Sequence, residues 1–312
     1  MARLAFLFPG QGSQFAGMGR DLVAAFPEAR AVYDRADAAL APFHLSISRV
    51  SFDGTEEELK RTAVTQPAIL VHSLAVFEVL KARGLAPTLL AGHSLGEWSA
   101  LVAAGALTLE DAVVLVHRRG TFMQEAVPAG QGAMGAVIGL DGPAVAAACA
   151  ETEAATGETV SAANFNSPEQ TVIAGTANAV AKASELLKQK GAKRVLPLPV
   201  SAPFHCALMK PAEEKLSPFL DAAPFADFDV PVVTNVDVLA NLSGAGAREA
   251  LRRQVCSPVR WVETVERLSR DAEGAVEVGP GTVLAGLAKR IAKEWPVRTT
   301  SDAEGIGKLL AG

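Results

Sequence analysis

The stretch Pro87-Thr-Leu-Leu-Ala-Gly92-His-Ser94-Leu-Gly96-Glu97 decides the fold of this chain. Its first five residues predict a buried strand, and residues 98–104, which are rich in helix formers, predict a helix that ends at Gly105. Between them lies the pattern G-x-S-x-G, so we expect Ser94 on a sharp turn from strand to helix. The flanking glycines permit that turn, and the helix N-terminus offers free N–H groups to a developing oxyanion. We therefore interpret Ser94 as a nucleophile; the alternative is a Gly/Ser-rich turn without chemistry.

Composition limits the class of protein to which this serine belongs. The chain has 312 residues, of which 49% are hydrophobic and 20% are charged, a balance typical of a soluble globular enzyme with one large domain or two unequal ones. The formal net charge of −5 argues against nucleic-acid binding, which needs a basic surface. The apolar runs are too short for a membrane span and Met1-Ala2-Arg3 leads directly into a strand, so we expect no transmembrane helix, no signal peptide and a cytoplasmic location.

The three cysteines are isolated from one another in the sequence. Cys149, Cys206 and Cys256 form no C-x-x-C pair, which argues against a disulfide framework and against a zinc site. We interpret them as buried or incidental thiols and predict no metal site.

A glycine-rich turn follows the first predicted strand, residues 4–8. The turn, Pro9-Gly-Gln-Gly-Ser-Gln14, lacks the G-K-[ST] of a phosphate loop and the spacing G-x-G-x-x-G, so it gives little support to nucleotide binding. It can still bring a backbone N–H or the Gln11 amide close to a ligand, and an ordinary loop between strand and helix explains it equally well.

Helical patterns occupy the rest of the first 127 residues. Helices are expected at residues 21–39, 55–61, 65–81 and 108–125. Thr55 suits an N-cap ahead of three glutamates, Pro67 suits the first turn of the third helix, and the stretch from Thr108 to Asp111 resembles a capping box.

The pattern changes at Gly132 to that of a separate lobe. Strands are expected at residues 133–138, 158–163, 170–174 and 192–198, with helices at 142–155 and 177–190. This β-α-β-β-α-β order is the ferredoxin-like split unit. Three prolines, Pro197, Pro199 and Pro203, end it, and an α/β pattern resumes beyond them. We therefore predict a ferredoxin-like small subdomain, residues 128–201, inserted into a large subdomain formed by residues 1–127 and 202–312.

The later part of the chain continues the large subdomain. Helices are expected at residues 210–222, 247–254, 258–269 and 283–293, and strands at 230–235, 275–278 and near 297.

A nucleophilic serine needs a base, and the chain has five histidines: His44, His72, His93, His117 and His205. His205 lies at the end of a proline-bounded loop where the two lobes are expected to meet, so it is the preferred candidate, ahead of His117.

The base must itself be oriented by a third group. No histidine follows His205, and neither Asp111 nor Asp141, which lie between the serine and His205, is an evident partner. This departs from an ordinary α/β-hydrolase, in which the acid and then the histidine follow the serine. We expect a main-chain carbonyl to accept from the imidazole instead.

Six blocks of sequence occur together in this chain: Phe8-Pro-Gly-Gln-Gly-Ser-Gln14, Gly92-His-Ser-Leu-Gly-Glu97, Arg119-Gly120 followed by Phe122-Met-Gln124, Asn164-Phe-Asn-Ser167, Ser201-Ala-Pro-Phe-His205 and Gly279-Pro-Gly281. Together they resemble the malonyl-CoA:acyl carrier protein transacylases of bacterial fatty acid synthesis. The blocks occur in the family's order and cover nearly the whole chain. The resemblance implies an α/β-hydrolase-like core with an inserted ferredoxin-like lobe, which agrees with the lobes expected from the residues.

The resemblance also implies roles for the dyad and its surroundings. Ser94 would attack the thioester of malonyl-CoA to form a malonyl-serine ester, and His205 would take its proton and later activate the incoming thiol. The backbone N–H groups of Gln11 and Leu95 would form the oxyanion hole. The main-chain carbonyl of Gln254 would orient His205.

Arg119 would bind the free malonate carboxylate, because a guanidinium matches that group bidentately. From the residues alone, Arg119 is an arginine in the last turn of a helix, where the helix dipole favours it.

Asn164, Gln170 and Gln14 either line the site or make ordinary turn contacts. Phe204 would narrow the space near the malonate α-carbon and favour malonyl over methylmalonyl units.

The implied partners are malonyl-CoA as substrate and an acyl carrier protein that carries phosphopantetheine, with no permanently bound cofactor; we expect a monomer. An acidic carrier protein would need a basic patch on this acidic enzyme. Two clusters are candidates, and either can instead be a solvated helix end: Lys188, Lys190, Lys193 and Arg194, and Lys289, Arg290 and Lys293.

Two other enzymatic functions remain open, besides a non-enzymatic α/β scaffold. The first is the same chemistry in polyketide assembly or in a malonate decarboxylase. The second is a serine esterase or thioesterase, which Arg119 and the lack of a late histidine disfavour.

Overall fold

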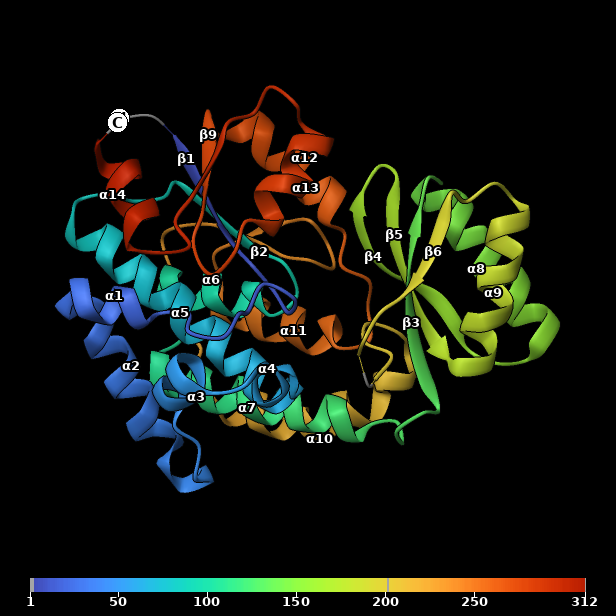
Figure 1. Ribbon diagram of the computed structural model, residues 1–312, viewed down its shortest axis with the longest axis horizontal. Helices are drawn as coiled ribbons and strands as arrows, with labels where there is room; N and C mark the ends of the chain where they lie inside the picture. Colours follow the sequence, from blue (N-terminus) through green and yellow to red (C-terminus); the bar gives the residue numbers. More distant parts are fainter. Residues whose placement is uncertain (1–2, 201, 312) are drawn as a thin grey trace.

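The computed structural model describes residues 3–200 and 202–311, which form two lobes side by side (Figure 1). The large lobe contains a six-stranded sheet in the order β10-β9-β1-β2-β7-β8, and the small lobe a four-stranded sheet in the order β4-β5-β3-β6. The strands of the large sheet are β1 (Leu4–Phe8), β2 (Leu89–Gly92), β7 (Val232–Val233), β8 (Ala240–Asn241), β9 (Gly274–Glu277) and β10 (Val297–Thr299). Those of the small sheet are β3 (Gly132–Ile138), β4 (Val160–Ser167), β5 (Gln170–Thr176) and β6 (Arg194–Pro197).

The large sheet is parallel except at β8, which pairs antiparallel with β7. Successive side chains of its central strand β1 point to opposite faces of the sheet, and both faces are buried. Phe6 and Phe8 join the core that contains α5 and α6, whereas Ala5 and Leu7 join the core that contains α12 and α13. Helices on both faces therefore explain why the strand is continuously apolar.

Fourteen α-helices are assigned in the described residues. They are α1 (Arg20–Ala25), α2 (Pro27–Leu40), α3 (Ile47–Asp53), α4 (Glu56–Lys60), α5 (Thr62–Ala82), α6 (Gly96–Ala104), α7 (Leu109–Glu125), α8 (Gly142–Thr156), α9 (Ala177–Gln189), α10 (Lys210–Ala222), α11 (Gly244–Gln254), α12 (Trp261–Asp271), α13 (Val283–Ile291) and α14 (Ala303–Ala311). The predicted caps are present: Thr55 forms a full capping box with Glu58, and the Thr108 side chain accepts from the backbone N–H of Asp111.

Several element boundaries were wrong. The helix expected over residues 21–39 is two helices, because Phe26 is extended and Pro27 opens a new helix. The helix expected from residue 65 begins at Thr62, which places Pro67 inside the helix rather than in its first turn. Helices α3 and α14 and the short strand β8 were not predicted.

Helix α5 is the central helix of the large lobe. In the part of the chain that the structure describes, it alone is long and apolar enough to cross a membrane, and 89% of that apolar window is buried inside the protein. It packs against α2, α6 and α7, so its apolar surface belongs to the core.

The small lobe has the predicted order β3-α8-β4-β5-α9-β6 and an antiparallel sheet, which confirms the ferredoxin-like unit. Val137 and Ile173 face α8 and α9, whereas Met134 and Ala136 join the core of the large lobe. The sheet is therefore covered by its own helices on one face and by the large lobe on the other. The limits proposed for the small subdomain stay a prediction, and residue 201 lies outside the described residues.

Two glycines lock the turn after β2 against the end of β1. A Cβ on Gly96 would lie 1.9 Å from the Phe8 carbonyl oxygen, and a Cβ on Gly92 would lie 1.9 Å from the Gly96 carbonyl carbon. The backbone N–H of His93 also donates to the Phe8 carbonyl, at 3.0 Å. The turn and the end of β1 therefore form one packed unit that admits no side chain at these glycines.

Replacing Gly96 by alanine tests this packing. We expect Gly96→Ala to lower the free energy of unfolding by about 2–3 kcal/mol, because the backbone must shift to admit the methyl group. Urea denaturation measures this. The control is Gly286→Ala on the exposed face of α13, where a Cβ meets nothing within 4 Å. This substitution should stabilise the helix by up to about 1 kcal/mol. Equal effects of the two substitutions would contradict the packing argument.

Candidate active site

Ser94 lies on the turn between β2 and α6 with a φ of 51°, as expected for a nucleophile elbow. This left-handed conformation costs a non-glycine residue about 1–3 kcal/mol. The Asn235 side chain holds the turn: its Oδ1 accepts from the Ser94 backbone N–H at 2.7 Å, and its Nδ2 donates to the Gly92 carbonyl at 2.7 Å. These two hydrogen bonds stabilise the strained turn and thereby fix the position from which the Ser94 side chain projects.

His205 is the histidine that reaches the serine. Its Nε2 lies 2.7 Å from the Ser94 Oγ, while its Nδ1 lies 3.0 Å from the carbonyl oxygen of Gln254 and 3.2 Å from that of Ser257. Carbonyl oxygens only accept, so Nδ1 carries the proton and Nε2 is free to accept the serine proton. The Gln254 carbonyl lies where the resemblance implied an acceptor; the sequence did not indicate Ser257.

Burial keeps His205 neutral. Desolvation, together with the positive charge of Arg119, lowers the pKa of His205 to about 3. The imidazole is therefore uncharged near neutral pH and is available as a general base.

Arg119 on α7 points at the same serine from a buried position, with 1% of its surface exposed. Its Nη1 donates to Gln66 Oε1 at 2.8 Å, and its Nη2 donates to Gln254 Oε1 at 3.0 Å and to Ser94 Oγ at 3.3 Å. Its buried Nε has no hydrogen-bond partner within the described residues. Burial lowers the pKa of Arg119 to about 10, so the guanidinium is still charged at neutral pH, and none of its hydrogen-bond acceptors is a carboxylate. It can therefore bind an acidic acyl group beside the nucleophile.

A cavity of about 110 Å³ brings the predicted residues together. Its lining includes Gln11, Gln66, His93, Ser94, Leu95, Arg119, Met123, Met134, Asn164, Leu198, Val200, Phe204 and His205. Among the predicted site residues, Gln254 lies behind this lining and acts on it through its contacts. Within residues 3–200 and 202–311, the backbone N–H groups of Gln11 and Leu95 have no hydrogen-bond acceptor in the protein, so both are available to an oxyanion.

The remaining sequence candidates divide into two groups. Asn164 on β4 and Phe204 line the cavity and are each 7% exposed. Gln14 instead accepts from the Gly12 backbone N–H at 2.8 Å, an ordinary turn contact, and Gln170 pairs in the small sheet and is not part of the lining.

Three of the other histidines have separate side-chain partners. His72 is buried with its Nε2 3.1 Å from the Ser301 carbonyl, and His117 places its Nδ1 2.9 Å from the Ala63 carbonyl. His93, although it precedes the serine, places its Nε2 2.8 Å from Asn166 Oδ1. These contacts leave His205 as the histidine hydrogen-bonded to Ser94.

Besides Ser257, three further polar residues of the site were missed by sequence reasoning: Gln66, Glu97 and Asn235. Gln66 and Glu97 had a signal, because each is a long polar side chain in a helix whose buried residues are mostly apolar. Asn235 follows a two-residue strand, and no local pattern distinguishes it. The three lie on different elements and surround the elbow and Arg119.

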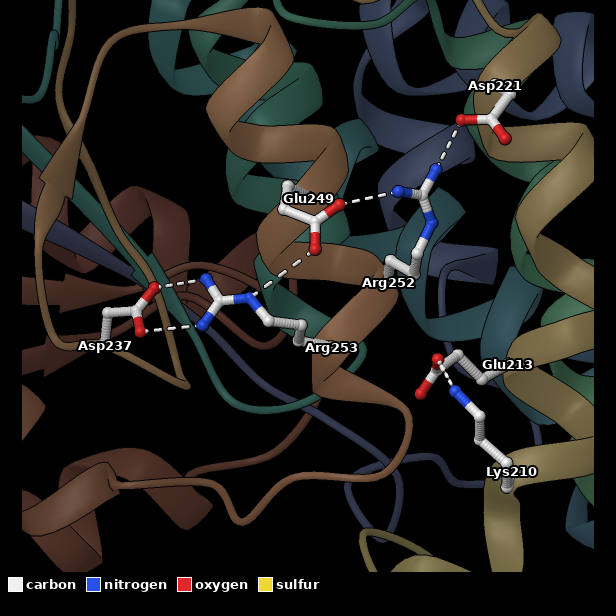
Figure 2. Close-up of polar contacts among 7 residues, drawn as sticks. All are labelled: Lys210, Glu213, Asp221, Asp237, Glu249, Arg252 and Arg253. Carbon is white, nitrogen blue, oxygen red and sulfur yellow. Dashed lines mark hydrogen bonds and ion pairs between the residues drawn. The ribbon is translucent and has the colours of Figure 1, made fainter.

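Ion pairs hold in place the segments that carry Gln254 and Asn235. Arg253 donates to both carboxylate oxygens of Asp237, at 2.9 and 2.5 Å, which joins the end of α11 to the loop after Asn235 (Figure 2). Arg252 joins the same helix to Asp221 on α10 and contacts Glu249. Exposed pairs contribute little singly, about 0–1 kcal/mol, but these connect α11, which ends at Gln254, to both of its neighbours.

No metal-binding arrangement is found in the described part of the chain: no group of three or more histidine, cysteine, aspartate and glutamate side chains is placed to hold an ion.

Comparisons with known proteins agree with this geometry. Residues 5–310 match the family model described as an acyl transferase domain. The chain is 51% identical over 293 residues to the malonyl CoA-acyl carrier protein transacylase of Escherichia coli (strain K12), covering 93% of each chain. It is 49% identical over 311 residues to the protein of that name from Bacillus subtilis (strain 168), covering 98% of this chain and 96% of the relative.

A solved structure is similar over the same length. It is a malonyl-transacylase in complex with its type II PKS acyl-carrier protein, 46% identical, with a TM-score of 0.95 and 99% of each chain covered.

The pH dependence of Ser94 reactivity tests the neutral state of His205. We expect the rate at which methanesulfonyl fluoride modifies Ser94 to stay constant from pH 8 to about pH 5, because the lowered pKa keeps the base unprotonated there. Mass spectrometry of the sulfonylated enzyme at each pH measures the rate, and His205→Ala, slow at every pH, is the control. A half-maximal rate near pH 6.5, the ordinary histidine pKa, would contradict the burial argument.

Proposed function

The chain belongs to the acyl transferase family that includes the malonyl CoA-acyl carrier protein transacylases, and we propose that it transfers malonyl groups from malonyl-CoA to the phosphopantetheine thiol of an acyl carrier protein. The observation that carries this proposal is the Arg119 guanidinium, buried 3.3 Å from the Ser94 Oγ with no carboxylate bound to it. A free acyl carboxylate is the group that completes this arrangement.

The first half of the proposed reaction acylates Ser94. The Oγ attacks the thioester carbonyl carbon of malonyl-CoA while the Nε2 of His205 takes the hydroxyl proton. Charge develops on the carbonyl oxygen, toward which the N–H groups of Gln11 and Leu95 would donate; each such donor contributes about 3–4 kcal/mol in comparable enzymes. The carbon–sulfur bond then breaks, and the imidazolium returns its proton to the departing CoA thiolate. The product is malonyl-Ser94.

The second half returns Ser94 to its free state. His205 takes the proton of the phosphopantetheine thiol, and the thiolate attacks the ester carbonyl carbon. The ester bond to Ser94 breaks, and its Oγ recovers the proton from His205. The same base thus acts in both halves of a ping-pong reaction.

Charge supports one of the two basic clusters as the carrier-protein surface. In the cluster at the end of the small lobe, Lys190 lies 2.9 Å from Glu151 and Lys193 lies 3.7 Å from Glu169, which offsets half of its lysines and arginines. For Lys289 and Arg290 on α13, no ion pair is found with any carboxylate of the described chain. An acidic carrier protein would therefore meet stronger positive charge at α13.

Fatty acid synthesis is the pathway we propose, with a monomer located in the cytoplasm and no permanently bound cofactor. The second candidate is the same transfer for polyketide synthesis, because the similar solved malonyl-transacylase is bound to a type II PKS acyl-carrier protein. Discharge of the malonyl enzyme by fatty acid carrier protein, compared with discharge by polyketide carrier protein, distinguishes the two.

Phe204 at the cavity wall supports a preference for malonyl over methylmalonyl units.

Mass spectrometry after brief mixing with malonyl-CoA tests the proposed function. We expect one malonyl adduct, located on Ser94, that persists in buffer and disappears when holo acyl carrier protein is added. Ser94→Ala should form no adduct. Rapid hydrolysis without an acceptor would instead indicate an esterase or thioesterase.

A substitution at Arg119 tests acyl selection. We expect Arg119→Ala to reduce kcat/KM for malonyl-CoA by about 100-fold or more, because a charge-assisted bidentate contact is lost. The value for propionyl-CoA, which has a methyl group where malonyl-CoA has its carboxylate, should change far less. Arg118→Ala, which removes the neighbouring arginine stacked on Phe219, is the matched control. Equal losses for both thioesters would refute the role proposed for Arg119.

A further inference from the structure

Glu97 is a buried carboxylate that the proposed reaction does not use. It lies in the first turn of α6 and is 1% exposed. Its Oε2 accepts from the Gln254 Nε2 at 2.7 Å and from the Asn235 backbone N–H at 3.0 Å. Within the described residues it makes no direct ion pair. Burying a carboxylate on neutral donors costs free energy, so its position calls for a physical reason.

The Gln254 side chain connects Glu97 to Arg119. Its Nε2 donates to Glu97 and to the Ser94 carbonyl, and its Oε1 accepts from the Arg119 Nη2 at 3.0 Å. A carboxylate can only accept, so the amide nitrogen of Gln254 must face Glu97 and the amide oxygen must face Arg119. The reversed amide would set an oxygen against the carboxylate and a donor against the guanidinium.

We infer that Glu97 is a positioning residue that fixes the Gln254 amide and, through it, holds the Arg119 guanidinium beside Ser94 to receive the acyl carboxylate. This inference rests on the proposed function. The contacts form one chain of hydrogen bonds from the Glu97 carboxylate through the Gln254 amide to the Arg119 guanidinium, which in turn donates to the Ser94 Oγ.

The charges around Glu97 favour the same arrangement. Arg253 and Asp237 also act on Glu97 electrostatically, but they are paired with each other. Arg119 is the remaining cation, and its charge opposes that of Glu97 across one amide. Burial raises the pKa of Glu97 to about 7, and the positive charge of Arg119 acts against that rise, so the guanidinium favours the ionised form of Glu97.

The other end of Gln254 adds to the effect. Its backbone carbonyl accepts from the Nδ1 of His205, so a single residue contacts the base, the Ser94 carbonyl and Arg119. Holding its side chain fixes the relation between the group that selects the acyl carboxylate and the groups that transfer it.

The test is the rate of Ser94 acylation in a single turnover, measured with malonyl-CoA and with propionyl-CoA. We expect Glu97→Ala to lower the malonyl rate by about 10- to 100-fold, the effect of losing one well-placed hydrogen bond to a charged group, and to lower the propionyl rate by less than about threefold. Glu97→Gln keeps an oxygen acceptor and should retain the malonyl preference. Glu277→Gln, which changes a buried carboxylate that binds the first turn of α13, should leave the ratio of the two rates unchanged.

Gln254→Leu removes the amide in the middle of this chain of hydrogen bonds. It should show the same malonyl-selective loss, and combining it with Glu97→Ala should add no further loss, because both act through one contact. Should Glu97→Ala fail to fold, Gln254→Leu carries the test. Modification of Ser94 by methanesulfonyl fluoride, a neutral reagent, reports whether the dyad of each variant is formed.

Each remaining outcome has a definite meaning. Equal loss for both thioesters, additive losses in the double variant, or a loss in Glu97→Gln as large as in Glu97→Ala would overturn the inference. If the unaltered enzyme shows no preference for malonyl over propionyl groups, the proposed function itself fails. If that preference exists and Glu97→Ala retains it, only the inference about Glu97 fails.

Discussion

The site depends on the close packing of the elbow against the end of β1. Gly96 touches the Phe8 carbonyl, and the His93 N–H donates to the same carbonyl. The turn that carries Ser94 and the loop that carries Gln11 are therefore fixed relative to each other by backbone atoms alone. Because backbone contacts have no rotamers to lose, the nucleophile and both proposed oxyanion donors are placed before substrate arrives, which is the condition for effective transition-state stabilisation.

The electrostatics of the site explain why His205 is held by carbonyls and not by a carboxylate. An aspartate at Nδ1 would place a second anion near the acyl carboxylate and would compete for the charge of Arg119. The carbonyls of Gln254 and Ser257 fix the tautomer without that charge. The carboxylate that the site does contain, Glu97, lies on the far side of an amide from Arg119.

The sequence predicted features that are encoded locally. The strand, glycines and helix around Ser94 and the order of elements in the small lobe follow from patterns within short windows. The predicted helix boundary was wrong at Phe26 because the local signal of Pro27 was missed, and at Thr62 because α5 begins three residues before the pattern that starts at Thr65. The sequence did not predict the hydrogen-bond partners of the elbow for another reason. Asn235 lies 141 positions from Ser94 in the sequence, and Gln254 lies 157 positions from Glu97. Such contacts are set by the sheet order, which no short window contains.

Backbone strain links the two members of the dyad. Among the described residues, four non-glycine residues have positive φ, and Ser94 and His205 are two of them. Each strained residue is held by specific acceptors: Asn235 Oδ1 for the backbone of Ser94, and two main-chain carbonyls for the ring of His205. Strain persists only where the surroundings over-determine it. These hydrogen bonds therefore do more than stabilise the fold, since they keep Oγ and Nε2 at 2.7 Å and proton transfer then requires no prior rotation of either side chain.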